Sequence, residues 1–163
     1  MTGTASTQAQ QERGRPLVLL VEDQSDLRRL YAEQLGLSGF DVSEAGDGLT
    51  AVARALEDSP DVVLMDLSLP GIDGWEATRR LKADSRTASI PVVALTAHDG
   101  AGELERATQA GCDWFVPKPC PPAALIAEVR RVLTGDYGTR TRSASGRMHA
   151  RIDVPPSHGS PST

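Results

Sequence analysis

The stretch "DVVLMDLSLPGIDG", residues 61–74, combines an apolar run with an acid at its end. Residues 62–65 are all apolar and lead directly into Asp66, and a Pro-Gly pair turns the chain at positions 70 and 71. An apolar run without alternation is typical of a strand that is covered on both faces, as in a parallel sheet. The stretch therefore predicts a buried strand that carries a carboxylate at its carboxyl end.

The same alternation of short apolar runs and helical patterns extends over residues 16–133. Residues 25–38, for example, place Leu27, Leu30, Tyr31 and Leu35 at helical spacing. The predicted strands are 17–22, 40–45, 61–66, 90–96 and 113–116, and the predicted helices are 25–38, 47–59, 74–83, 102–110 and 122–133. Because single helices separate the strands, each crossover returns the chain to the same end of the sheet, and the strands run parallel. The pattern predicts one doubly wound α/β domain of five βα units.

Length, charge and composition exclude several classes of protein. The chain has 163 residues, which suffices for one domain with a core, and its formal net charge of −5 is not that of an obvious DNA-binding protein. No run approaches the roughly 20 apolar residues of a membrane helix, and none has the character of a signal peptide. The two cysteines, Cys112 and Cys120, form neither a metal nor a disulfide framework. We therefore expect a cytoplasmic protein with reduced thiols and no membrane segment.

The two ends of the chain differ from its middle. Residues 1–15 and 134–163 are rich in small and polar residues and lack apolar periodicity, so we expect two disordered tails around a domain at 16–133. The C-terminal tail has no pattern for a helix-turn-helix, which predicts that it adds no DNA-binding domain. Its four arginines leave contact with a nucleic acid or an acidic partner open as an alternative.

Polar side chains gather where the predicted strands end. In chain order these residues are Glu22 and Asp23 after the first strand, Asp66 after the third, Thr96 after the fourth and Lys118 after the fifth. Open parallel sheets bind ligands beyond the carboxyl ends of their strands. Neighbouring carboxylates repel one another, and a divalent cation such as Mg²⁺, which prefers oxygen ligands, removes the conflict. An aspartate there can also act as a nucleophile toward phosphorus, with the cation, a lysine and a hydroxyl holding the added charge.

Residues 16–133 resemble the receiver domain of two-component response regulators. Four segments carry the resemblance: "VLLVEDQ", "VVLMDLSLPGIDGWE", "VVALTAH" and "DWFVPKP". The resemblance implies a flavodoxin-like fold with strand order 2-1-3-4-5. It also implies that Asp66 is the phosphoacceptor and that Asp23 and Asp66 bind Mg²⁺ directly. By the same resemblance Glu22 supports the metal through water, and Ser68 offers it a backbone carbonyl.

The resemblance assigns further roles around the phosphoryl group. Thr96 and Lys118 are expected to hold it, and Phe115 falls where the family keeps its aromatic switch residue. In that scheme the Thr96 hydroxyl moves inward after phosphorylation, and Phe115 turns into the space that it leaves. A cis peptide bond before Pro119 is also implied.

The function implied is that of a stand-alone receiver, a signalling switch more than a turnover enzyme. A sensor histidine kinase or histidine phosphotransfer protein would phosphorylate Asp66, and a downstream protein target would read the changed conformation. Self-catalysed phosphoryl transfer and slow autodephosphorylation would be its only chemistry. A dimer that forms on phosphorylation is left open.

Three alternatives remain to be weighed against this reading. A phosphohydrolase with an aspartate nucleophile requires a second aspartate two residues further on, where this chain has Ser68. A flavin carrier of the same fold requires a phosphate loop after the first strand, where Glu22 and Asp23 would repel a phosphate. A receiver-like scaffold that is never phosphorylated differs from a working receiver only in its chemistry. A phosphorylation assay distinguishes the two.

Overall fold

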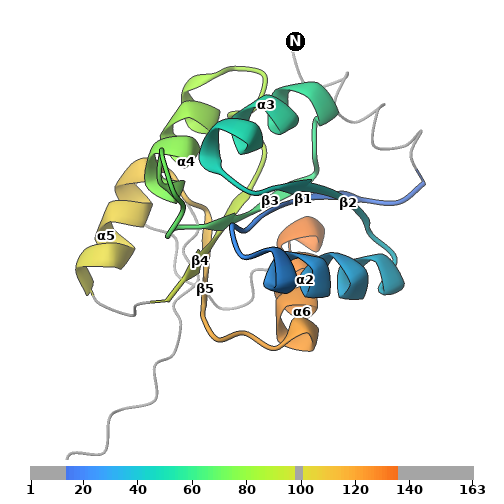
Figure 1. Ribbon diagram of the computed structural model, residues 1–163. Coiled ribbons are helices and arrows are strands. Elements are labelled where there is room, and N and C mark those ends of the chain that lie inside the picture. Colours follow the sequence, from blue (N-terminus) through green and yellow to red (C-terminus); the bar gives the residue numbers. More distant parts are fainter. Residues whose placement is uncertain (1–13, 98–100, 136–163) are drawn as a thin grey trace, which may run out of the picture.

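The computed structural model describes residues 14–97 and 101–135, and Figure 1 shows their arrangement. The strands are β1 (Leu17–Val21), β2 (Asp41–Ala45), β3 (Val62–Asp66), β4 (Val92–Thr96) and β5 (Trp114–Pro117). The helices are α2 (Ser25–Leu37), α3 (Gly48–Asp58), α4 (Gly74–Ala83), α5 (Ala101–Ala110) and α6 (Pro122–Thr134). The predicted strands and helices are thus confirmed to within two residues at each end.

The five strands form one parallel sheet in the order β2-β1-β3-β4-β5, as the resemblance implied. The register pairs Val21 with Met65 across β1 and β3, and Asp66 with Leu95 across β3 and β4. The carboxyl ends of the three central strands are therefore level with one another, and the residues that follow them meet at one edge. This flavodoxin-like arrangement places the functional question at that edge.

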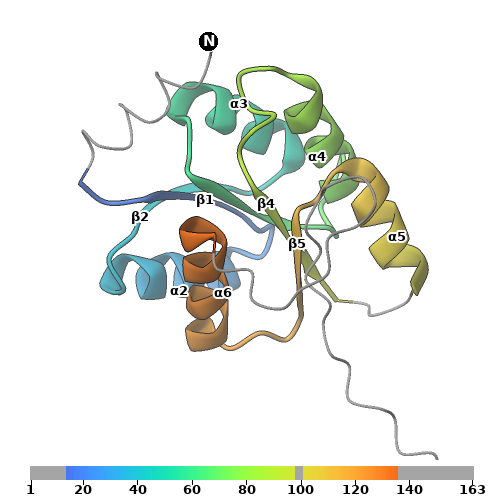
Figure 2. The same cartoon turned by 180° about the vertical axis from the view of Figure 1, so that it is seen from behind.

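Helices cover both faces of the sheet. Helices α2 and α6 lie side by side on one face, and α3, α4 and α5 lie on the other (Figures 1 and 2). Within β1, Val18 and Leu20 pack toward α2 and α6, whereas Leu19 and Val21 pack with residues of α3 and α4. Because both faces are buried, both sets of alternate residues are apolar, which explains the uninterrupted apolar runs.

Helices α2 and α6 each leave an apolar residue at or beyond the margin of the buried side. Tyr31 and Leu35 form the buried side of α2, but Leu30 is 44% exposed because it lies one position around the helix from that side. In α6, Val132 is buried and Leu133 only packs against the core from its margin. The helical pattern thus fixes the element and leaves the edge of its buried face uncertain.

The structure describes two residues on each side of the predicted domain, 16–133. Arg15, which we had counted with the N-terminal tail, donates hydrogen bonds to the carbonyls of Gly36, Gly39 and Phe40 at the end of α2. At the other end, α6 continues to Thr134. The remaining tail residues lie outside the described part of the chain, so their disorder stays a prediction. Across the described residues, none of the helices has the length and apolar character needed to cross a bilayer.

Candidate functional site

Three carboxylates meet at the carboxyl edge of the sheet. Glu22 and Asp23 follow β1, Asp66 ends β3, and one ligand oxygen from each lies within 4.8 Å of the others. Glu22 and Asp66 are buried, whereas Asp23 is exposed. The three residues therefore form an acidic cluster with two buried carboxylates and one exposed carboxylate.

Lys118 brings a positive charge to this acidic cluster from the loop after β5. Its Nζ donates to Oε2 of Glu22 at 2.8 Å and to Oδ2 of Asp66 at 3.1 Å. The Lys118 side chain is only 17% exposed, and the side chains of Glu22 and Asp66 are 0% and 5% exposed. A single ammonium group thus bridges the two buried carboxylates.

The buried charges perturb one another. The pKa of Glu22 is raised to about 7, chiefly because burial disfavours its charged form; the hydrogen bond from Lys118 opposes this rise, and the neighbouring Asp66 adds to it. Burial alone would lower the pKa of Lys118, but its hydrogen bonds and charge interactions with Glu22 and Asp66 outweigh burial and raise it. The lysine is therefore held in its charged form, and the carboxylates remain incompletely compensated.

The donor set fits a hard divalent cation. Oε1 of Glu22 is buried and has no hydrogen-bond partner among the described residues, which is costly for a charged oxygen in a native site. All the candidate ligand atoms are carboxylate oxygens, the type that Mg²⁺ prefers. A cation or its bound water would both satisfy this oxygen and reduce the repulsion among the three acids.

The turn after Asp66 is shaped by two contacts. The backbone N–H of Ser68 donates to Oδ1 of Asp66 at 2.9 Å, which orients the carboxylate. A Cβ at Gly74 would clash with the carbonyl oxygen of Asp66 and lie 2.7 Å from Cα of Leu67. Helix α4 can therefore begin against the backbone of Asp66 only because residue 74 is glycine. Sequence reasoning missed this role, although the Asp-Gly pair at positions 73 and 74 was the available signal.

Thr96 lies next to the loop after β5 that carries Lys118. It ends β4, is 6% exposed, and its carbonyl accepts the backbone N–H of Lys118 at 2.7 Å. The parallel register places Thr96 opposite Pro117. Strand β4 thus carries the threonine and also fixes the backbone of the lysine that faces Asp66.

Phe115 is buried within β5, with 3% of its surface exposed, and packs in the core on the side of α3 and α4. The ring thus already lies inward. The expected inward turn would have to start from a different conformation, in which the ring points outward. The expected cis bond is confirmed between Lys118 and Pro119.

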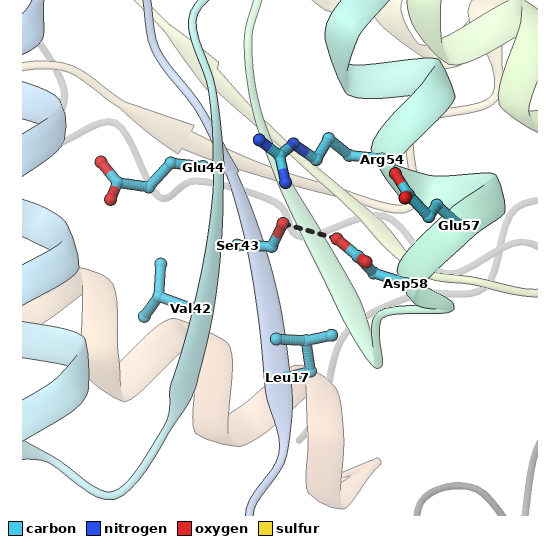
Figure 3. A pocket seen from close by; sticks show the side chains of 7 residues that line it. All are labelled: Leu17, Val42, Ser43, Glu44, Arg54, Glu57 and Asp58. Carbon is cyan, nitrogen blue, oxygen red and sulfur yellow. Dashed lines mark hydrogen bonds between the residues drawn. The ribbon is translucent and has the colours of Figure 1, made fainter.

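A separate open pocket of about 650 Å³ lies between β2 and α3 (Figure 3). Its lining residues are Leu17, Val42, Ser43, Glu44, Arg54, Glu57 and Asp58. The Ser43 hydroxyl donates to Oδ2 of Asp58 at 2.8 Å, as Figure 3 shows. The pocket shares no residue with the acidic cluster and has no part in the chemistry considered below.

Known proteins are similar to this chain in sequence. Residues 18–130 match the family model of the response regulator receiver domain. The chain is 40% identical over 134 residues to the response regulator PleD of Caulobacter vibrioides, covering 80% of this chain but 29% of PleD. It is 35% identical over 116 residues to the polar-differentiation response regulator DivK of Brucella anthropi, covering 71% of this chain and 94% of DivK.

Solved structures agree with the sequence comparison. The chemotaxis protein CheY4 of Vibrio cholerae superposes with a TM-score of 0.70 at 27% identity, covering 73% of this chain and 99% of CheY4. The receiver domain of the sensor histidine kinase PA1611 of Pseudomonas aeruginosa, solved with a magnesium ion coordinated in its active site cleft, gives a TM-score of 0.69 at 33% identity and covers 74% of this chain and 98% of that domain. With its sheet order and sequence in agreement, the chain belongs to the receiver-domain family of two-component response regulators.

Proposed function

We propose that Asp66 accepts a phosphoryl group from a sensor histidine kinase or a histidine phosphotransfer protein, and that the phosphorylated domain signals to a downstream protein. The observation that carries this proposal is the position of Asp66 at the end of the central strand β3, 3.1 Å from the ammonium group of Lys118 and beside Glu22 and Asp23. A nucleophilic carboxylate needs nearby positive charge to offset the charge of its product, and Lys118 supplies it here.

In the transfer step, a carboxylate oxygen of Asp66 forms a bond to phosphorus while the phosphorus–nitrogen bond to the donor histidine breaks. The electron pair of that bond returns to the imidazole nitrogen. The product gains negative charge at a site that is already acidic, and the ammonium of Lys118 lies close enough to offset part of it. Because Ser68 N–H holds Oδ1 of Asp66 and Lys118 holds Oδ2, the carboxylate is oriented before the donor arrives.

We assign the metal ligands as the family resemblance implies: Asp23 and Asp66 by their carboxylates, Ser68 by its backbone carbonyl, and Glu22 through water. A bound Mg²⁺ would neutralise charge on the incoming phosphoryl group. The unpartnered Oε1 of Glu22 and the close approach of the three carboxylates support this assignment.

Thr96 is the proposed link from the site to the rest of the domain. Its hydroxyl would donate a hydrogen bond to the phosphoryl group, and any shift of β4 reaches Phe115 on the neighbouring strand, where Ala94 and Phe115 are partners in register. Since Phe115 is already buried, we expect the signal to depend on repacking around the ring. A phosphoryl group that favours one packing over another by a few kcal/mol would shift the population between them.

The proposal is tested by incubating the chain with a small phosphodonor and Mg²⁺ and reading the intact mass. Wild type should gain one phosphoryl group, and Asp66→Asn, which keeps the shape but removes the nucleophile, should gain none. Asp61→Asn is the matched control, because Asp61 precedes the same strand at its other end and accepts a hydrogen bond from the backbone N–H of Leu17. Equal mass gain in Asp66→Asn and wild type would contradict Asp66 as the acceptor, and no gain in wild type would favour the unphosphorylated scaffold.

A further inference from the structure

The loop that carries Lys118 has few hydrogen-bond donors of its own. Prolines occupy positions 117, 119, 121 and 122, and proline has no backbone N–H. On the side of β4, the loop is fixed by the N–H of Lys118, which donates to the carbonyl of Thr96 at 2.7 Å. To hold the lysine in one place, the other side of the loop needs a donor from elsewhere in the chain.

Tyr31 supplies that donor. Its hydroxyl donates to the carbonyl oxygen of Cys120 at 2.8 Å, across 89 positions of sequence. Tyr31 belongs to α2, which lies beside α6 on the same face of the sheet, and Cys120 lies two residues before α6 begins (Figures 1 and 2). The bond therefore joins α2 to the loop between β5 and α6.

The environment of Tyr31 makes this bond persistent. The residue is 3% exposed and belongs to the core cluster between the sheet and α2 and α6. A buried hydroxyl without a partner is costly, so the phenol and the carbonyl stay paired. Burial also raises the pKa of Tyr31, so its hydroxyl keeps the proton that it donates.

Two hydrogen bonds fix the loop at and just after Lys118: one goes to the carbonyl of Thr96, and the other comes from the hydroxyl of Tyr31. One acts on the backbone of Lys118 itself, and the other acts on Cys120, two residues further along. Helix α2 also begins two residues after Asp23, so the helix that follows the acidic pair reaches across to the loop of the lysine. We propose that Tyr31 is a positioning residue for Lys118: its hydroxyl holds the carbonyl of Cys120, and the loop so fixed keeps Nζ of Lys118 on Glu22 and Asp66. The role of this placement in phosphoryl transfer rests on the function proposed above, whereas the placement itself does not.

The chain offers an internal reference for the test, because it contains only two lysines, Lys82 and Lys118. Their side chains are equally exposed, at 18% and 17%. Nζ of Lys82 donates to Asp113 and to the carbonyls of Ala88 and Ile90 at the other end of the sheet. The rate of amine acetylation at each lysine, followed by peptide mass spectrometry, therefore reports the two ends of the domain in one experiment.

Tyr31→Phe removes the hydroxyl and keeps the ring that packs in the core. Lys118 should then be acetylated about fivefold faster than in wild type, which corresponds to the loss of one ordinary hydrogen bond, while Lys82 keeps its rate. Thr87→Val is the matched control: it removes a buried hydroxyl that donates to the carbonyl of Leu81 at 2.6 Å, remote from the lysine loop, and should leave the rate at Lys118 unchanged. An unchanged Lys118 rate in Tyr31→Phe would overturn the proposal, as would an equal rise at both lysines, since that means general loosening.

A second measurement connects the placement to the chemistry. With a small phosphodonor and Mg²⁺, Tyr31→Phe should gain the phosphoryl group about fivefold more slowly than wild type, and Thr87→Val at the wild-type rate. Faster acetylation of Lys118 with wild-type transfer in Tyr31→Phe would contradict its role in positioning for transfer. Faster acetylation in Tyr31→Phe together with no phosphoryl uptake by wild type would support the placement and contradict the proposed function instead.

Discussion

The two ends of the sheet use the same residue types to different effect. At the amino end, Asp61 accepts the backbone N–H of Leu17 at 2.7 Å. Oδ2 of Asp113 accepts the N–H of Val92 at 2.9 Å and the ammonium of Lys82 at 2.8 Å. Each of these carboxylates therefore has a donor supplied by the fold.

At the carboxyl end, three carboxylates lie close together, but Lys118 bonds only two of them, Glu22 and Asp66. Oε1 of Glu22 is left without a partner among the described residues. The charges there are close together and under-compensated. The amino end is therefore arranged for stability, whereas the carboxyl end keeps binding capacity that the fold leaves unused. Such a division is common where a site trades stability for function.

The largest change in stability should come from Gly74→Ala, which disrupts the packing of α4 against the carboxyl end of β3. The new Cβ meets backbone atoms of Asp66 and Leu67, which cannot move aside cheaply, so the free energy of unfolding should fall by about 3 kcal/mol in urea denaturation. Gly36→Ala in α2 is the control, because no atom outside its own stretch of helix lies within 4 Å of its added Cβ, and it should gain up to about 1 kcal/mol. A loss at residue 74 of only a few tenths would contradict the close packing described here.

At the amino end, Asp113→Ala should lower the free energy of unfolding by about 2 kcal/mol, because the N–H of Val92 and the ammonium of Lys82 lose a shared acceptor. Asp41→Ala removes an exposed ion pair with Arg15, separated by 3.7 Å, and should cost less than about 0.5 kcal/mol. If both substitutions had the same small effect in chemical denaturation, the amino end would not be the stabilising one.

At the carboxyl end, removing an acid should have the opposite sign. Without divalent cations, Asp23→Asn should raise the free energy of unfolding by less than about 1 kcal/mol, because an exposed charge beside Glu22 and Asp66 is removed while the shape is kept. The measurement is urea denaturation in a chelating buffer. A clear destabilisation would show that the three acids do not repel one another in the folded state.

The two cysteines should differ in their reactivity toward alkylating reagents, one before β5 and the other after it. Cys112, just before β5, is fully buried, and burial raises its pKa to about 12, so it presents almost no thiolate. Cys120, after β5, is partly exposed, although burial also raises its pKa. Alkylation of the folded protein at mildly alkaline pH should therefore label Cys120 first, as read by peptide mass. Labelling of Cys112 at the same rate would mean that the amino end opens readily.

Much of this site could be predicted from sequence, because parallel topology brings the carboxyl ends of strands together. Glu22, Asp23, Asp66 and Lys118 gather at one edge for that reason, and the apolar runs fixed which strands were buried. The bond from Tyr31 to Cys120 could not be predicted, because its acceptor is a backbone carbonyl, which every residue carries.

Other features depend on tertiary contacts that leave a weak sequence signal. The need for glycine at position 74 arises where α4 begins against the end of β3, and the anchoring of Arg15 arises from carbonyls at the end of α2. Leu30 fits the helical spacing and is still largely exposed, because spacing alone does not define the width of the buried face.

The effect of Mg²⁺ on stability decides whether the carboxyl end of the sheet is an under-compensated site for a cation. At a Mg²⁺ concentration tenfold above its dissociation constant, the free energy of unfolding of wild type should rise by about 1.4 kcal/mol, because the cation binds the folded state. Asp23→Asn should show a much smaller rise at the same concentration, and Asp41→Ala the full one. No rise in wild type, or an equal rise in Asp23→Asn, would contradict the claim.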